Sequence, residues 1–579
     1  MFNWPLTRRI FSLAGPYKKS VYIAIVLTLI GAVLAPYRTY LIKVTLDDYV
    51  ATSDYNGLIN IVLLMVVLLL VNTAINFWQG YLTAWLGQTV IKDLRLRVYG
   101  FITRLKMKYF DRTPVGTMVT RSVNDIETLS NVFSEGLIVI TGDILQIVVI
   151  LFFMFNIDWR LSLVSLSVMP LLLISAYVFK EKVKKSFTEV RNAVANLNAF
   201  VQEHITGMHI VQIFNREKEE YDRFKSINGL HRDANIRGVM YYSVFFPVVE
   251  IITALATGLV VWYGVKLIIG GDISYGVIVT FIIFINQFFR PIRQLADRVN
   301  TLQMGMVAAE RVFKLIDETD QLEPTGTYKP GRIKGDVEFK NVWFAYNEED
   351  WVLKDISFKV EEGKSLALVG ATGAGKSSIV NLINRYYAIN KGEILIDGRN
   401  VSEYDVYDLR TNVAAVLQDV YLFSGSIESN IRLYDETITR EKIIEAAKLI
   451  GADTFIQRLP GGYDFNVMER GSSLSVGQRQ MISFIRALAA DPKVLILDEA
   501  TSSVDSETEE LIQHAIEVLM QGRTSIAIAH RLSTIQHADR ILVLDKGQIV
   551  ESGTHDELLN AKGFYEKLYN YQFAGVAQN

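Results

Sequence analysis

The stretch LALVGATGAGKSS, residues 366–378, decides the fold of the C-terminal half of this chain. Its four leading apolar residues predict a buried β-strand, and the glycines after them predict a tight turn into a helix. From Gly370 to Ser377 it fits the pattern G-x-x-x-x-G-K-[ST], in which backbone N–H groups and the positive end of a helix surround a phosphate. The stretch therefore predicts a phosphate-binding loop in an α/β domain.

The same loop predicts the contacts of a bound nucleotide. We expect Lys376 to reach the β- and γ-phosphates and Ser377 to ligate Mg²⁺. The residues expected to contact the nucleotide in this loop are Gly370, Thr372, Gly373, Ala374, Gly375, Lys376, Ser377 and Ser378.

Two further apolar strands end in residues that suit hydrolysis. KVLILDEATSSVD (493–505) places Asp498 and Glu499 at the end of a strand, where open α/β sheets bind ligands. We expect Asp498 to help to hold Mg²⁺, and Glu499 to deprotonate a water that attacks the γ-phosphate. His530 ends the strand of SIAIAH and is expected to contact the γ-phosphate. The alternatives are that the two acids are solvated groups at the end of a strand, which the neighbouring phosphate loop disfavours, and that the histidine is a structural or surface group.

The chain as a whole is too apolar for an ordinary soluble enzyme. Of its 579 residues 50% are hydrophobic and its mean hydropathy is +0.22, yet 21% of the residues are charged. This combination predicts a membrane domain joined to a soluble one. The net charge of −3 argues against a nucleic-acid partner, and the absence of cysteine excludes disulfides, thiolate metal sites and cysteine nucleophiles.

The apolar residues gather in the first half of the chain, in six runs that suit membrane-spanning helices. These runs are Val21–Ile42, Leu58–Leu86, Leu137–Phe155, Leu161–Phe179, Tyr241–Ile269 and Val277–Phe289. Lys and Arg are concentrated in the long links after spans two and four, whereas the links after spans one and five carry mainly acids. The positive-inside rule therefore places both chain ends and both long links in the cytoplasm.

The two long links are rich in helix formers and periodic in their apolar residues, so we expect helical hairpins. Their turns are predicted in FDRTPVGTMV (110–119) and near IFNREKEE (213–220). Solvated, charged helices are one interpretation, and helices that reach toward the following soluble domain are the other.

Together these features resemble an ABC half-transporter of the exporter type, similar to multidrug and lipid exporters, over nearly the whole chain. The resemblance implies an α-helical transmembrane domain in residues 1–317, a linker in 318–335, and an α/β P-loop ABC nucleotide-binding domain in 336–579. It also implies that Tyr346 stacks on adenine and that Gln418 links Mg²⁺ and the attacking water to the membrane domain. Residues 502–505 would signal across a dimer, and Glu469 and Arg470 would touch the cytoplasmic helices.

The segment LSVGQ (474–478) resembles the signature loop of this family, with Val476 where a glycine is usual. By this resemblance Ser475, Gly477 and Gln478 bind the ATP of a second chain, so the functional unit is a dimer. Because a β-branched residue disfavours positive φ, we expect Val476 to have negative φ, a side chain turned from the nucleotide and no loss of activity.

The sequence thus predicts an ATP-driven exporter that uses ATP and Mg²⁺ and moves a drug, lipid or lipid-linked amphiphile outward across the bacterial inner (plasma) membrane. The alternatives are an ATP-gated channel, a regulatory ABC subunit and, within transport, a peptide exporter. A homodimer is favoured over a heterodimer, because one chain carries every catalytic group. Glu250, inside the fifth span, is either a functional acid or a structural charge paired across the bundle, and the second is favoured.

Overall fold

The computed structural model describes residues 4–318, 326–347, 350–498, 506–528 and 532–573. The chain forms two compact units. The first comprises Met1–Thr103 with Val115–Glu318, and the second comprises Arg104–Pro114 with Thr319–Asn579. The short segment 104–114, which interrupts the first unit in sequence, therefore belongs to the second.

The first unit is helical, and six of its helices are long and apolar enough to cross a membrane. This confirms the six predicted spans. The spans lie in α2 (Lys18–Val44), α3 (Tyr55–Ile102), α7 (Leu137–Ile157), α9 (Met169–Thr206), α11 (Glu217–Ile269) and α12 (Tyr275–Ile316). The shorter helices are α1 (Trp4–Leu13), α5 (Val115–Ser122), α6 (Asn124–Asn131), α8 (Trp159–Leu166) and α10 (Met208–Ile213).

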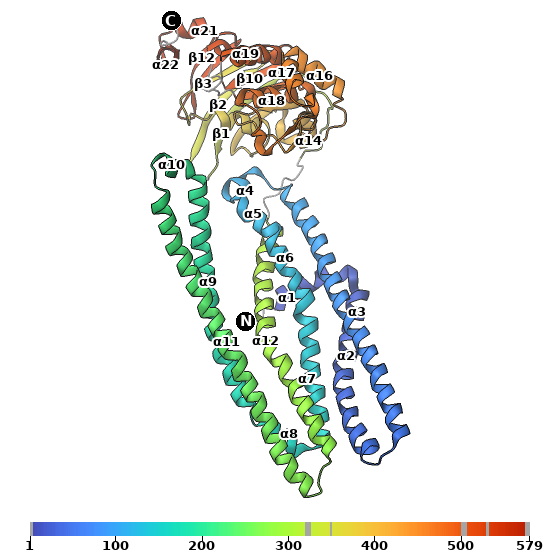
Figure 1. The fold of residues 1–579 in the computed structure, drawn as a ribbon. Helices are drawn as coiled ribbons and strands as arrows, with labels where there is room; N and C mark the ends of the chain where they lie inside the picture. Colours follow the sequence, from blue (N-terminus) through green and yellow to red (C-terminus); the bar gives the residue numbers. More distant parts are fainter. Residues whose placement is uncertain (1–3, 319–325, 348–349, 499–505, 529–531, 574–579) are drawn as a thin grey trace. The chain divides into compact units, whose positions relative to one another are not determined.

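The long links are helical, as predicted. Helix α11 has 53 residues. At 1.5 Å per residue it is about 80 Å long, against about 30 Å for a bilayer core. It runs side by side with α9, and α10 closes this hairpin (Figure 1). The turn into α11 passes through Asn215, whose φ is +50°. The other predicted turn is the break at Thr113 and Pro114, which separates α4 (Met107–Arg112) from α5.

The second unit is built on a six-stranded sheet in the order β12-β11-β3-β10-β9-β6. The strands from β11 to β6 are parallel, and only β12 is antiparallel to its neighbour. All five residues of β10 are buried, as are four of the five in β9, because helices cover both faces of a parallel sheet. The bounds are β3 Ser365–Gly370, β6 Val413–Val416, β9 Val494–Asp498, β10 Thr524–Ile528, β11 Arg540–Asp545 and β12 Gln548–Gly553.

Two smaller sheets complete the second unit. One has four antiparallel strands, in the order β2 (Trp351–Val360), β1 (Val337–Ala345), β4 (Lys391–Ile396) and β5 (Arg399–Asn400). The other pairs β7 (Gly425–Ser426) with β8 (Asn466–Val467). The helices are α13 Lys376–Ile383, α14 Val406–Asn412, α15 Ile427–Arg432, α16 Arg440–Leu449, α17 Asp453–Arg458, α18 Val476–Ala490, α19 Ser506–Met520, α20 Leu532–Gln536, α21 His555–Asn560 and α22 Phe564–Phe573. The α-helical bundle and the α/β domain confirm the predicted fold class.

Candidate nucleotide site and transport path

The phosphate loop joins β3 to α13, and two of its glycines have no room for a side chain. Gly375, the residue before α13, has φ +103°, and a Cβ there would lie 2.6 Å from Cδ2 of Leu353. At Gly370 a Cβ would lie 2.3 Å from the carbonyl oxygen of Leu544. The loop therefore requires glycine at both positions, and its backbone amides stay accessible to an anion.

Lys376, the first residue of α13, is held by the loop itself. Its ammonium donates to the carbonyl oxygens of Gly370 (2.6 Å) and Ala371 (3.1 Å). Burial lowers the pKa of this ammonium, and the negative charge of Asp498 acts in the opposite direction. A buried cation whose partners are mainly neutral carbonyls is suited to bind phosphate oxygens.

Tyr346, predicted to stack on adenine, is fixed by aromatic and polar contacts. Its hydroxyl lies 3.1 Å from the Oγ of Ser378. The rings of Phe344 and Tyr387 meet its ring edge to face, at centroid distances of 4.7 and 4.9 Å. Such pairs add to the stability that burial of the rings provides. These contacts fix the orientation of the tyrosine ring.

Segment 104–114 contacts this aromatic group within the second unit. The hydroxyl of Tyr387 donates a hydrogen bond to the carboxylate of Asp111. The next residue, Arg112, donates to Oδ1 of Asn347 at 2.9 Å, beside Tyr346. Burial, followed by the bond to Asp111, raises the pKa of Tyr387. Sequence reasoning did not single out Tyr387 or Asp111, because nothing local marks their pairing.

The predicted Mg²⁺ ligands lie at or after the carboxyl ends of parallel strands in the large sheet. Ser377 follows β3, Asp498 ends β9, and Gln418 is exposed two residues after β6. These strands are parallel, so their carboxyl ends share an edge, where such sheets bind ligands. Hydroxyl, carboxylate and amide oxygens are hard donors that suit Mg²⁺. Glu499, His530 and residues 502–505 lie outside the described residues, so their roles stay predictions.

The signature loop ends at α18 in a capping box. The Oγ of Ser475 accepts a hydrogen bond from the amide of Gln478 at 3.2 Å, and Oε1 of Gln478 accepts one from the amide of Ser475 at 3.0 Å. The amides of Val476 and Gly477, in the first turn, have no intrahelical acceptor. These two amides and the Ser475 hydroxyl are thus free to donate to an anion at the helix N-terminus.

Val476 occupies the first position of α18, in helical backbone, with a side chain that is 44% exposed. The expected negative φ is therefore confirmed. The loop before it is held by Arg479, which donates to the carbonyls of Leu474 (2.9 Å) and Gly471 (3.3 Å). Glu469 and Arg470, predicted to touch the cytoplasmic helices, are both exposed.

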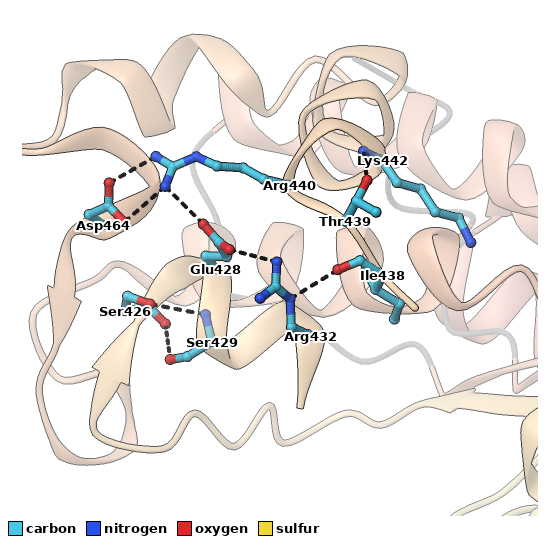
Figure 2. Close-up of polar contacts among 9 residues, drawn as sticks. All are labelled: Ser426, Glu428, Ser429, Arg432, Ile438, Thr439, Arg440, Lys442 and Asp464. Atoms are coloured by element: carbon cyan, nitrogen blue, oxygen red, sulfur yellow. Dashed lines mark hydrogen bonds and ion pairs between the residues drawn. The ribbon is translucent and has the colours of Figure 1, made fainter. Parts of the chain in front are cut away.

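An ion-pair network braces the helices that pack around α18 (Figure 2). Arg440 bridges Asp464 at 2.8 Å and Glu428 at 3.0 Å, and Glu428 also pairs with Arg432 at 2.8 Å. Arg432 donates in addition to the carbonyl of Ile438 at 2.9 Å. The Arg440 guanidinium holds the pKa of Asp464 below its ordinary value. The network joins α15, α16 and the turn before β8, three segments separated in sequence.

In the first compact unit, which contains the six spans and is called the membrane unit below, an ion pair joins α7 to α12. Asp143 pairs with Arg298, which also donates to Oε1 of Gln294 at 3.0 Å, and the side chains of the ion pair are largely buried. Sequence reasoning missed Asp143, although it lies inside a predicted span, where an acid is a functional candidate by default. Glu250, in contrast, is exposed on α11, and no ion pair holds it among the described residues.

Both halves of the chain match known protein families. Residues 21–292 match the family model described as ABC transporter transmembrane region, and residues 353–502 match the one described as ABC transporter. An uncharacterized ABC transporter ATP-binding protein of Bacillus subtilis, YknV, is 37% identical over 99% of this chain and 95% of its own length.

Two other relatives carry functional names. An ATP-dependent lipid A-core flippase of Syntrophus aciditrophicus is 34% identical over 98% of this chain and 94% of its own length. A probable multidrug resistance ABC transporter ATP-binding/permease protein of Bacillus subtilis, YheH, is 38% identical over 90% of this chain and 77% of its own length. The chain therefore belongs to the ABC transporter family, as a multi-pass, exporter-type half-transporter of the bacterial inner membrane that hydrolyses ATP.

Proposed function

We propose that this chain moves an amphiphilic substrate out of the cytoplasm or the inner leaflet by alternating access, in a dimer that hydrolyses ATP at its interface. The observation that carries this proposal is the separation of the two nucleotide loops. The phosphate loop packs into a core that contains Ala374 and Ile379, whereas the signature loop packs into another core that contains Leu474 and Met481. Among the described residues no hydrogen bond or ion pair joins the two loops.

A site split in this way is completed by a second chain. The phosphate loop of one chain would hold the phosphates through Lys376 and the loop amides, and Ser475 and the Gly477 amide of the other chain would approach the γ-phosphate. Ser377, Asp498 and Gln418 would hold Mg²⁺, whose charge stabilises the transferring phosphoryl group. Glu499 would take the proton of the attacking water, with His530 at the γ-phosphate. A homodimer is favoured, because one chain supplies all of these groups.

Support for an amphiphilic substrate comes from α12. Asn286, Arg290 and Gln294 recur every fourth residue and are exposed, in line with the paired Arg298. Four-residue spacing places these side chains on one helix face. Polar groups inside a membrane protein face a water-filled cavity rather than lipid. A substrate with polar and apolar parts would suit such a face among apolar spans.

The test is the ATPase activity of the purified chain, alone in lipid nanodiscs, with a panel of drugs, lipids and lipid-linked compounds. We expect activity from this chain alone and stimulation by members of one substrate class. Glu499→Gln should bind ATP but hydrolyse it at least about a hundredfold more slowly, as expected for loss of a general base. Glu510→Gln, an exposed acid on α19, is the matched control and should be unchanged. Near-normal turnover by Glu499→Gln would refute the assignment, and ATP-gated ion currents would favour a channel.

A further inference from the structure

A groove of about 420 Å³ lies between α9 and α11 in the membrane unit. Its α9 wall includes Ile174, Val178 and Lys182, and its α11 wall includes Met240 and Val244. The four apolar side chains are 51–62% exposed in the chain. At the groove the ring of Phe179 stacks on that of Phe245, with centroids 3.9 Å apart. The groove is therefore apolar along most of its length and cationic at one end.

The sequence places this groove at the cytoplasmic edge of the bilayer. The apolar run of the fourth span ends at Phe179, and the apolar run of the fifth begins at Tyr241. Both residues contribute to the groove. Ile174 and Val178 thus lie on the hydrocarbon side of the boundary, and Lys182, about one helical turn beyond Phe179, lies at the headgroup level.

The charge at the headgroup end is not balanced within the chain. Lys180, Lys182, Lys184 and Lys185 follow one another on α9, with Glu181 as the one acid among them. Where the structure describes the chain, no carboxylate forms an ion pair with any of these lysines. Beyond Glu181, the next acid along α9 is Glu189, which is already paired with Arg237 of α11 at 3.0 Å. A negative headgroup would supply the missing partner.

We propose that this groove binds one anionic phospholipid of the cytoplasmic leaflet, with an acyl chain along Ile174, Val178 and Val244 and the phosphate at Lys182. Burial of the acyl chain provides most of the affinity, since each buried CH₂ group contributes favourably. Lys182, the one lysine that lines the groove, provides the preference for an anionic headgroup over a zwitterionic one. The site is formed by the α9–α11 hairpin of one chain and needs no transported substrate.

The chain has no cysteine, so a single reporter can be placed without other changes. Tyr177→Cys puts a fluorophore beside the groove, because Tyr177 is 65% exposed and does not line it. The full chain goes into nanodiscs that contain either doxyl-labelled phosphatidylglycerol or doxyl-labelled phosphatidylcholine at the same mole fraction. We expect an apparent affinity about fivefold higher for phosphatidylglycerol, the factor that one lysine contributes at an anionic surface.

The controls separate this site from a general attraction to anionic lipid. Lys182→Gln should abolish the preference for phosphatidylglycerol over phosphatidylcholine, and Lys182→Arg should keep it. The control Lys218→Gln, in the first turn of α11, should leave this preference unchanged. A fluorophore at Leu70→Cys, 64% exposed on α3, should show no preference.

Two results would overturn the proposal. One is equal quenching by both lipids at Tyr177→Cys. The other is high-yield cross-linking of Val178→Cys between two chains, which would show that a second copy covers the groove. ATPase activity within about twofold of the parent chain confirms that the variants are folded, so a lost preference reports on the site itself.

Discussion

Ser475 has two proposed roles: it caps α18, and it contacts the γ-phosphate bound by a second chain. Replacing Ser475 by Asp separates these two roles. The Oγ of Ser475 caps α18 by accepting the Gln478 amide at 3.2 Å. Asp is as good an N-cap as Ser, and a negative charge at a helix N-terminus is favourable, so Ser475→Asp should keep the helix intact. If Ser475 instead only capped the helix, the substitution would be nearly neutral for hydrolysis.

The proposed dimer predicts a large effect, because the new carboxylate would face the γ-phosphate of the other chain. Two unit charges of the same sign about 4 Å apart repel by about 4 kcal/mol at an effective dielectric constant of about 20. This repulsion corresponds to nearly a thousandfold in binding. We therefore expect Ser475→Asp to lower ATPase activity at least about a hundredfold, with the unfolding midpoint within about 2 °C of the parent chain.

Ser475→Asn is the matched control, because Asn caps equally well without a charge. It should retain activity within about tenfold, whereas Ser475→Ala should also destabilise α18 by about 1 kcal/mol through loss of the cap. The assays are steady-state ATP hydrolysis and thermal unfolding of the full chain in nanodiscs. Equal hydrolysis rates for the Asp and Asn variants would refute the placement of Ser475 at the γ-phosphate.

Four further changes test other parts of the structure. Val476→Gly should change ATPase activity by less than about threefold, because Val476 already has helical backbone; a gain of tenfold or more would show that the valine limits the loop. Gly375→Ala should weaken ATP binding about 5- to 150-fold in an equilibrium binding assay, because φ is +103° and such backbone strain costs about 1–3 kcal/mol. Asp143→Asn should destabilise the membrane unit by about 3–5 kcal/mol, because it leaves Arg298 without its ion-pair partner. The double variant Asp143→Asn with Arg298→Met should recover most of this stability, as measured by thermal unfolding. Bonding to Arg9 holds the pKa of Asp317 below its ordinary value, so this pair contributes stability above about pH 4 that is lost as pH falls through the lowered pKa. The protection factors of residues 4–13 against hydrogen exchange, corrected for the intrinsic exchange rate at each pH, should therefore fall in acid in the parent chain and show no such fall in Arg9→Gln.

The features that the sequence predicted well are those whose cause is local. The phosphate loop follows from glycines within eight residues of one another, and the structure shows why Gly370 and Gly375 admit no side chain. The six spans follow from apolar runs, which need only be long enough to cross the bilayer. The long cytoplasmic helices follow from helix formers and periodicity in the same way.

The features that the sequence did not predict depend on contacts between distant residues. Asp143 and Arg298 are 155 residues apart, and Asp111 and Tyr387 are 276 residues apart. No periodicity or motif relates such positions, because tertiary packing brings them together. Segment 104–114, which belongs to the second compact unit, contacts Tyr387 and Asn347 through pairings of the same distant kind. Glu499 and His530 lie outside the described residues, so their assignment still depends on sequence and family resemblance alone.

The position of Val476 at the start of α18 is compatible with the role proposed for the signature loop. The first residue of a helix has a negative φ, and its amide N–H donates to no carbonyl oxygen of the helix. A β-branched residue meets both needs, since φ near −60° is open to every L-residue and its amide is unchanged. In the proposed dimer the donors to the phosphate are that amide, the amide of Gly477 and the hydroxyl of Ser475, and none of them belongs to the valine side chain. Val476 is 44% exposed, so in the proposed dimer the remaining effect of its isopropyl group is on shape complementarity to the second chain. Val476→Gly should therefore alter the affinity between the two chains more than the rate of hydrolysis within the dimer.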